Sequence, residues 1–372
     1  MKKILCLFLP LLMGSAAQAQ YGQRLYDLDS LSQEWFNDGL ITDQFLVSGK
    51  PVYAATGKVQ SPTATGALIE RSRFARIGFT GATQANRFYY LFYNGAERPS
   101  RMNSICEGSN AFLMSGVVYS NNAPGTGDVL LLKTAASGVP QSVRKVDLGG
   151  FDESFCTRRS AKTTSKYYTC GSSYVQSSSA AFLMKHNASG SVVNWVRKFS
   201  LPCGTTASLA EATSVIDDSL SGNVVVIGHV RSASPSLACQ NAFIARFSAS
   251  GALHWLHFIA SNNAANFNLQ SIRATNAAQE YVITGSALNP ANGKNGILLM
   301  RVNTAGAAPA FVFSKLISSP GPTPNFPVSQ QAGYDVVSRK DSAGVLSYYV
   351  AGQTSYTFGS GDGTMLRADQ NG

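Results

Sequence analysis

The sequence predicts an all-β protein, a six-bladed β-propeller whose blades are four-stranded antiparallel sheets. Two repeated marks support this prediction. A seven-residue segment that ends in glycine, with a basic residue five positions earlier, occurs six times. An apolar or aromatic run that also ends in glycine occurs six times in step with it. No stretch carries helical periodicity long enough to compete with the strand pattern.

The first mark predicts a tight hairpin in each unit. The segments are ARIGFTG (75–81), LKTAASG (132–138), MKHNASG (184–190), ARFSASG (245–251), MRVNTAG (300–306) and LRADQNG (366–372). The turn glycines are therefore Gly81, Gly138, Gly190, Gly251, Gly306 and Gly372, spaced 52 to 66 residues apart. A small or polar residue followed by glycine suits a turn that needs positive φ. The strand after it carries a large ring, such as Trp255, which we expect to pack between neighbouring sheets.

The basic residue of the first mark has two interpretations. The six residues are Arg76, Lys133, Lys185, Arg246, Arg301 and Arg367. The first interpretation is structural: each side chain lies on the third strand of its sheet and is paired or reaches water at one rim. The second is a six-fold ring of ligand-binding cations. We favour the structural interpretation.

The second mark predicts a buried strand in each unit. Its runs are FLVSG (Gly49), FLMSG (Gly116), YYTCG (Gly171), VVVIG (Gly228), YVITG (Gly285) and YYVAG (Gly352). They are rich in β-branched and aromatic residues, which is typical of strands. With one strand before each run and two strands at each hairpin, the unit has four strands. Four strands in 52 to 66 residues is typical of a propeller blade.

The two ends of the chain predict how the ring closes. In the first unit we expect Asp38-Gly39 to form the turn between the first two strands, which leaves 50–66 as a long loop. The last unit stops at its turn glycine, Gly372, so its outer strand is missing. Residues 21–31 are the candidate for that strand. We therefore expect one propeller domain over residues 20–372.

The first 19 residues predict export. Lys2 and Lys3 precede a short apolar run, and Ala17-Gln18-Ala19 is typical of a cleavage site. We expect residues 1–19 to be a signal peptide and the protein to be periplasmic or secreted. The apolar run is too short for a membrane span, and no later run is long enough, so we expect no transmembrane segment.

Charge and cysteine content exclude some functions. The net charge is +10, but the Lys and Arg residues are scattered, so we expect no nucleic-acid partner. No spacing of Cys or His suggests a metal site. Five cysteines follow the signal peptide. We expect a Cys203–Cys239 disulfide on the face that carries the long loops, and Cys156–Cys170 is a second pairing that the sequence allows.

The units resemble the bacterial β-propeller repeats of exported proteins, which read roughly G-x-T…aFvxKlDasGnvvW. They are also similar, more faintly, to the quinoprotein repeat D-x-x-T-G-x-x-x-W. The resemblance covers nearly the whole chain and implies the fold rather than a function. The chain has no adjacent-cysteine pair and no calcium cluster of the quinoprotein dehydrogenases, so we expect no cofactor.

For function, we favour a non-enzymatic binding module that recognises a protein or glycan partner through its loop face, as a monomer. Its predicted ligand-binding residues are Tyr53, Lys58, Tyr93, Arg98, Arg101 and Phe326. The alternative is a glycan-active hydrolase or lyase with its site in the central channel. The sequence identifies no catalytic residue, because the acid pairs Asp152-Glu153 and Asp217-Asp218 adjoin predicted turns. Acids gathered at the channel mouth would favour the enzyme, and an exposed aromatic and basic patch would favour the binding module.

Overall fold

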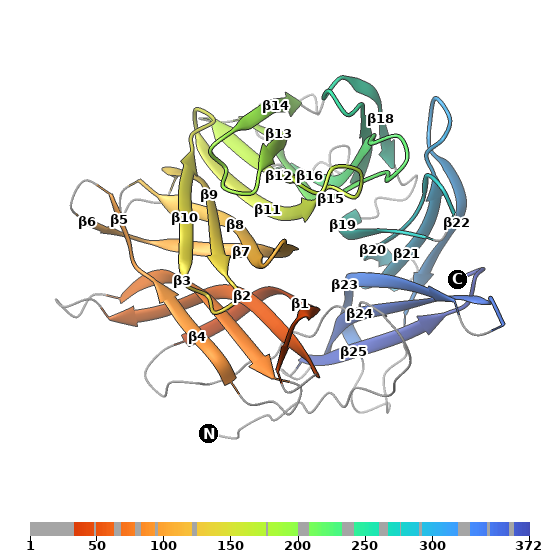
Figure 1. Ribbon diagram of the computed structural model, residues 1–372. Helices are drawn as coiled ribbons and strands as arrows, with labels where there is room; N and C mark the ends of the chain where they lie inside the picture. The colour runs from red at the N-terminus through yellow and green to blue at the C-terminus, as the bar shows by residue number, and fades with distance from the viewer. Residues whose placement is uncertain are drawn as a thin grey trace.

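The computed structural model is an all-β protein built mainly from four-stranded antiparallel sheets around a common centre (Figure 1). It describes residues 33–372 apart from 48–49, 63–67, 79–82, 94–95, 121–124, 176–177, 200–207, 233–241, 260–266, 276, 290–291, 319–327, 341–342 and 357–360. The signal-peptide prediction and the closing strand at 21–31 therefore lie outside the described residues. Among the described residues, no helix has the length and apolar character needed to cross a membrane.

Four sheets each contain four consecutive strands. The first has β1 (Gln33–Val47), β2 (Lys50–Pro62), β3 (Leu68–Gly78) and β4 (Thr83–Tyr89). The second has β7 (Ser100–Gly108), β8 (Ala111–Tyr119), β9 (Gly127–Ala135) and β10 (Pro140–Val146). The third has β11 (Phe151–Arg159), β12 (Lys166–Val175), β13 (Ser178–Asn187) and β14 (Val193–Phe199). The fourth has β15 (Ser208–Asp217), β16 (Val224–Ser232), β17 (Ala242–Phe247) and β18 (Leu253–Ile259).

The remaining strands form a seven-stranded sheet and a small hairpin. The large sheet has β19 (Phe267–Ala274), β20 (Glu280–Asn289), β21 (Lys294–Asn303), β22 (Ala310–Ile317), β23 (Val328–Lys340), β24 (Leu346–Tyr356) and β25 (Gly361–Ala368). A single parallel bridge, Asn295 with Gln330, joins its two antiparallel parts. The hairpin is β5 (Leu91–Tyr93) with β6 (Ala96–Arg98). The propeller-like class that the sequence predicts is confirmed at the level of antiparallel four-stranded sheets.

The strands β1, β7, β11, β15, β19 and β23 lie innermost, and each contacts the next around the centre (Figure 1). Each of them carries a β-bulge. It lies opposite the glycine of the second mark on the neighbouring strand, or opposite Gly57 in the first unit. In β15, Ala212 pairs with Gly228 and Ser214 pairs with Ile227, so Thr213 is the extra residue. A Cβ on Gly228 would lie 2.0 Å from the carbonyl oxygen of Glu211. The glycine is therefore required because the bulged strand comes too close for a side chain.

The first unit departs from its predicted arrangement. β1 runs without interruption through Asp38-Gly39, which pairs with Thr56 and Ala55 directly after a bulge at Asn37 and forms no hairpin turn. Residues 50–62, expected within a loop, form β2. The position opposite the bulge is taken by Gly57, paired with Phe36, and Gly49 lies outside the described residues. The sequence prediction failed because an Asp-Gly pair can follow a bulge as readily as it forms a turn.

The hairpin glycines of the first mark hold adjacent sheets together. Gly138, Gly190, Gly251 and Gly372 have φ between +68° and +85°, as the turn prediction requires. The neighbouring sheet lies against them: a Cβ on Gly251 would be 2.8 Å from the indole ring of Trp195. Trp195 also donates its Nε1–H to the carbonyl of Ala249 at 3.3 Å. The predicted packing of the large ring between sheets is confirmed here.

Candidate functional site

A paired acid and base lie near the starts of two neighbouring inner strands, β7 and β11. Arg101, near the start of β7, donates two hydrogen bonds to Glu153 of β11: Nε to Oε1 at 2.8 Å and NH2 to Oε2 at 2.6 Å. Asn103 donates to the same Oε1 at 2.6 Å. Burial alone would lower the pKa of Arg101, but the hydrogen-bonded Glu153 raises it instead. This bidentate pair is held rigidly at the mouth of the inner strands.

A second acid extends the pair toward the first sheet. Glu70 on β3 accepts a hydrogen bond from Lys58 Nζ at 2.9 Å, and its Oε1 lies 3.8 Å from Arg101 NH1. Asn37 on β1 donates to Asn103 Oδ1 at 3.2 Å. The mouth of the inner strands therefore presents carboxylates and cations in alternation. We call Lys58, Glu70, Arg101 and Glu153 the mouth group.

Deeper along the inner strands lies a second group, the central cluster of Asp38, Arg158, Arg273 and Asp335. Arg273 NH2 is 3.0 Å from Asp335 Oδ1, and Arg158 NH1 is 3.9 Å from Asp38 Oδ2. The side chains of the two arginines are 14% and 20% exposed. These four residues lie on the inner strands β1, β11, β19 and β23.

Asp335 is the most perturbed acid of the central cluster. It is 4% exposed, and Ser271 Oγ donates a hydrogen bond to its Oδ1. Its Oδ2 has no hydrogen-bond partner within the part of the chain that the structure describes. Burial raises the pKa of Asp335 to about 6, the nearby charge of Asp38 adds to this, and Arg273 opposes it. A buried carboxyl group in this state can carry a proton near neutral pH.

Asp38 has a different role in the same cluster. Its Oδ2 accepts hydrogen bonds from Ser104 Oγ at 2.9 Å and from the Ile105 backbone N–H at 3.0 Å. Ser104 in turn accepts from the Thr157 N–H at 3.1 Å. These contacts run from one inner strand to the next, directly after each bulge. Asp38 therefore joins the first and second sheets, and these bonds fix its carboxylate.

Another acid faces a histidine on the fourth sheet. Glu211, near the start of β15, lies with its Oε2 2.7 Å from His229 Nε2. Glu211 occupies the position two residues before its bulge, as Arg101 and Glu153 do before theirs. The sequence pattern predicted no catalytic or ligand-binding role for these acids. The repeat does mark the position of each bulge. The residue that follows the bulge is the middle one of the triplets NDG, NSI, FCT, TSV, QSI and YDV.

The predicted ligand-binding residues separate into several places. Lys58 and Arg101 meet through Glu70 in the mouth group. Tyr53 also lies on β2, but five residues from Lys58 and thus about 16 Å away along the strand, packed against Ala55 and Ala75. Arg98 lies on β6 and pairs with Leu91 of β5, the strand that ends at Tyr93. Phe326 and the side chain of Tyr93 lie outside the described residues.

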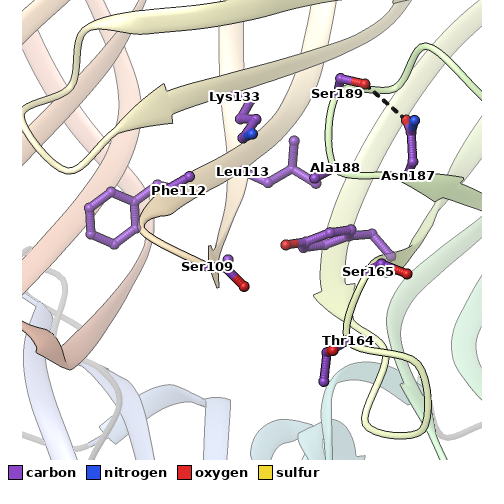
Figure 2. A pocket seen from close by; sticks show the side chains of 12 residues that line it. Ser109, Phe112, Leu113, Lys133, Thr164, Ser165, Asn187, Ala188 and Ser189 are labelled. Carbon is purple, nitrogen blue, oxygen red and sulfur yellow. Dashed lines mark hydrogen bonds between the residues drawn. The ribbon is translucent and has the colours of Figure 1, made fainter.

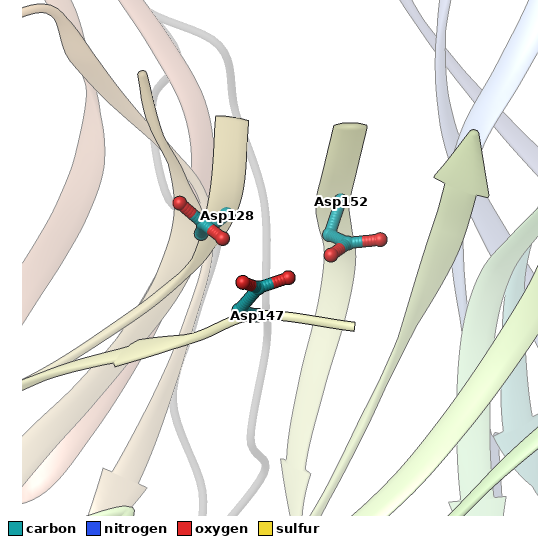
Figure 3. Close-up of side chains that lie close together, drawn as sticks. All are labelled: Asp128, Asp147 and Asp152. Carbon is teal, nitrogen blue, oxygen red and sulfur yellow. The ribbon is translucent and has the colours of Figure 1, made fainter. Parts of the chain in front are cut away.

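Three carboxylates gather where the second sheet connects to the third (Figure 3). Asp128, Asp147 and Asp152 each place one oxygen within 4.8 Å of the others. Carboxylate oxygens are ligands that calcium prefers. However, Lys145 Nζ lies 2.7 Å from Asp128 Oδ2, and the Leu148 N–H donates to Asp152 Oδ2 at 2.6 Å. These bonds give the three carboxylates a structural role, because they hold the connection between β10 and β11 in place.

The cysteine predictions have different outcomes. Cys156 and Cys170 stand opposite each other on β11 and β12, but both are buried free thiols, so the expected disulfide is absent from the structure. Directly opposed residues of antiparallel strands have Cβ atoms about 4.5–5.5 Å apart, wider than most disulfides need. Cys106 is also a buried free thiol. Cys203 and Cys239 lie outside the described residues.

Comparison with known proteins finds similarity only at the level of structure. No protein-family model and no curated protein sequence matches the chain. Among solved structures, the NanB sialidase of Streptococcus pneumoniae matches with a TM-score of 0.48 and 10% identity, over 92% of this chain and 68% of that one. A neuraminidase-like protein of A/flat-faced bat/Peru matches with a TM-score of 0.44 and 11% identity, over 86% and 83%. A thermostable family-43 glycoside hydrolase matches with a TM-score of 0.40 and 10% identity, over 79% and 97%.

The favoured interpretation of the sequence, a non-enzymatic binding module, is corrected on the geometry of the described residues. The geometry agrees with the alternative, because Lys58 and Arg101 are engaged by Glu70 and Glu153 instead of forming an exposed basic patch. Acids gather around the inner strands, which is the arrangement that distinguishes an enzyme from a binding module.

Proposed function

We propose that the protein is a glycan-active hydrolase or lyase whose site lies at the centre of the inner strands. The observation that carries the proposal is Asp335: a buried carboxyl group with a pKa raised to about 6, whose Oδ2 has no hydrogen-bond partner among the described residues, and the charge of a second carboxylate, Asp38, adds to this rise. Cleavage of a glycosidic bond needs a protonated acid at the leaving oxygen, and a raised pKa keeps that proton available. Asp335 is the proton donor in this proposal.

The neighbouring residues support this role in distinct ways. Arg273 and Ser271 fix the Oδ1 atom, so the proton resides on Oδ2. The side chain of Asp38 is held by Ser104 and Ile105, which orients it for charge stabilisation or for positioning water. The mouth group offers hydrogen-bonding groups for sugar hydroxyls at the entrance. Glu211 with His229 is the candidate base for a lyase.

The test is activity toward polysaccharides with a matched pair of variants. Wild-type protein should release reducing ends from at least one member of a panel of neutral and acidic polysaccharides, or an ultraviolet-absorbing unsaturated product if it is a lyase. Asp335→Asn should lose at least about 100-fold of that activity, the lower range for general-acid catalysis. Asp369→Asn, the same chemical change at an exposed position, should retain it. Equal activity of wild type and Asp335→Asn would remove Asp335 from the mechanism.

The proposed site requires a complete ring, and we propose that six blades form it. The strands β23, β24 and β25 form the last blade, which residues 21–31 complete as its outer strand beside β25. This closure, together with export after removal of residues 1–19, extends the description beyond the described residues. A variant lacking 20–31 should unfold or oligomerise. If that variant stays monomeric and keeps the wild-type melting temperature, residues 21–31 do not close the ring.

A further inference from the structure

Five of the six basic residues of the first mark donate a hydrogen bond within the described residues, and one does not. Arg367 donates within its own unit, to Ser347 Oγ at 3.2 Å. In four units the side chain donates a hydrogen bond to a carbonyl in the hairpin of the next unit. The bonds are Arg76 to Ala136 at 3.0 Å, Lys185 to Ala249 at 3.2 Å, Arg246 to Thr304 at 2.7 Å and Arg301 to Gln370 at 3.4 Å. The structural interpretation of these residues is therefore confirmed for most of the ring.

Lys133 on β9 is the exception. The hairpin it should reach is Asn187–Gly190 of the third sheet, but no hydrogen bond or ion pair joins Lys133 to any residue that the structure describes. That hairpin satisfies its own polar groups: Ser189 Oγ donates to Asn187 Oδ1 at 3.1 Å. Lys133 instead lines a cavity of about 280 Å³ between the second and third sheets (Figure 2). An ammonium group is thus directed toward open space.

The cavity lies at the hairpin end of the sheets, opposite to the mouth group. Its walls come from three turns: β7–β8 with Ser109, β11–β12 with Thr164 and Ser165, and β13–β14 with Asn187, Ala188 and Ser189. Phe112, Leu113 and Tyr167 form its apolar side. Figure 2 shows the Lys133 side chain between the strands of the second sheet and the β13–β14 turn. Because the lining spans two sheets, the cavity exists only in the assembled ring.

The chemistry of the lining selects for an anion that also carries hydroxyl groups. No Asp or Glu lines the cavity. A second cation stands at its edge: Arg159 donates to Ser109 Oγ at 2.9 Å and to the Thr164 carbonyl at 2.7 Å. Burial raises the pKa of Tyr167 to about 12, so its hydroxyl remains a neutral hydrogen-bond donor. The volume is at the small end of ligand sites, which limits the occupant to about the size of a monosaccharide.

We propose that this cavity binds a small hydroxylated carboxylate, such as a sugar acid, with Lys133 pairing with the carboxylate. The hydroxyls of Ser109, Thr164 and Ser165 hydrogen-bond the ligand, and the ring of Tyr167 supports its apolar face. The proposal is independent of the central cluster. It explains why Lys133, alone among the six equivalent cations, makes no hydrogen bond or ion pair within the described residues.

The experiment titrates the full mature protein with D-glucuronate and follows backbone amide shifts by NMR, with D-glucose and inorganic phosphate as parallel probes. Glucuronate should shift the amides of 108–109, 164–167 and 187–189, and glucose should not. Lys133→Met should weaken glucuronate binding roughly 10- to 100-fold, as expected for one charged hydrogen bond. Lys133→Arg should retain most of the affinity because it keeps the charge.

The melting temperature separates binding from folding. Lys133→Met should melt within about 1 °C of wild type, because Lys133 makes no hydrogen bond to the next sheet that the substitution could remove. Losing a contact worth about 1 kcal/mol would shift the melting temperature by a few degrees. Unchanged glucuronate affinity in a folded Lys133→Met protein would overturn the proposal. So would phosphate binding without glucuronate binding, equal binding of glucose, or the absence of shifts at these turns with glucuronate.

Discussion

Replacing Asp335 by Asn should change how stability depends on pH, and the size of the change follows from the structure. The unfolded carboxyl has a pKa of 3.8, and in the folded protein burial raises the pKa of Asp335 to about 6. Between these values the folded protein binds the proton and the unfolded chain does not. Stability therefore falls as pH rises through this window, and about 3 kcal/mol is lost once pH exceeds 6.

The Asn side chain resembles the protonated carboxyl and does not titrate, so Asp335→Asn removes this loss. The free energy of unfolding of the variant minus that of wild type should increase by about 3 kcal/mol between pH 3.5 and pH 7. Urea unfolding at half-unit pH intervals measures the difference directly. Asp369→Asn provides the control, since Asp369 is exposed and its curve should run parallel to that of wild type.

Two results would refute the reasoning. A difference that stays constant across this pH range would mean that Asp335 is ionised in the folded protein as readily as in the unfolded chain. A difference that decreases with pH would mean that Arg273 stabilises the ionised form by more than burial destabilises it. Either result would also remove the basis for Asp335 as a proton donor at neutral pH.

Three further predictions concern the fold. Gly228→Ala should destabilise the protein by more than about 3 kcal/mol in chemical denaturation, because the new Cβ would lie 2.0 Å from a backbone carbonyl, and Gly306→Ala, whose nearest contact is 3.3 Å, should cost under about 1 kcal/mol. Burial lowers the pKa of His186 to about 4, so stability should fall by up to about 3 kcal/mol as pH drops from 6.5 toward 4, and His186→Gln should lose this dependence in matched unfolding curves. Arg246→Met should cost about 2 kcal/mol or more by urea unfolding, because buried carbonyls of the next hairpin, including that of Thr304, lose their donor. A cost below about 0.5 kcal/mol would show that this contact does not join the sheets.

The general plan of the fold could be predicted because the same glycine turn recurs in each unit. Turn glycines and strands of β-branched residues recur at every unit, and four of the glycines, Gly138, Gly190, Gly251 and Gly372, have positive φ, so each unit reinforces the interpretation of the others. The prediction for the first unit failed for a local reason. Asp38-Gly39 has the composition of a hairpin turn but lies within β1, directly after a bulge, and the Asp38 carboxylate accepts hydrogen bonds from Ser104 and Ile105 of the next sheet. Only the tertiary contact decides between the two.

The candidate site was harder to predict because its members are far apart in the sequence. Asp38 and Asp335 come from the first and last inner strands, and Arg158 and Arg273 come from strands between them. No local motif joins these residues, since only the ring arrangement brings them to one centre. Glu153 was interpreted as a turn residue although it lies within β11, where Arg101 fixes it. Aligning the units on their bulges, rather than on their turns, would have placed these positions together.

Glycan cleavage by wild type and by Asp335→Asn at pH 6, measured side by side on the same panel of polysaccharides, tests the central claim most directly. Wild type should release cleavage products from at least one polysaccharide. The folded variant should show at least about 100-fold lower cleavage activity on it. Cleavage at the same rate by both proteins, or no cleavage of any member of the panel by wild type, would contradict the claim.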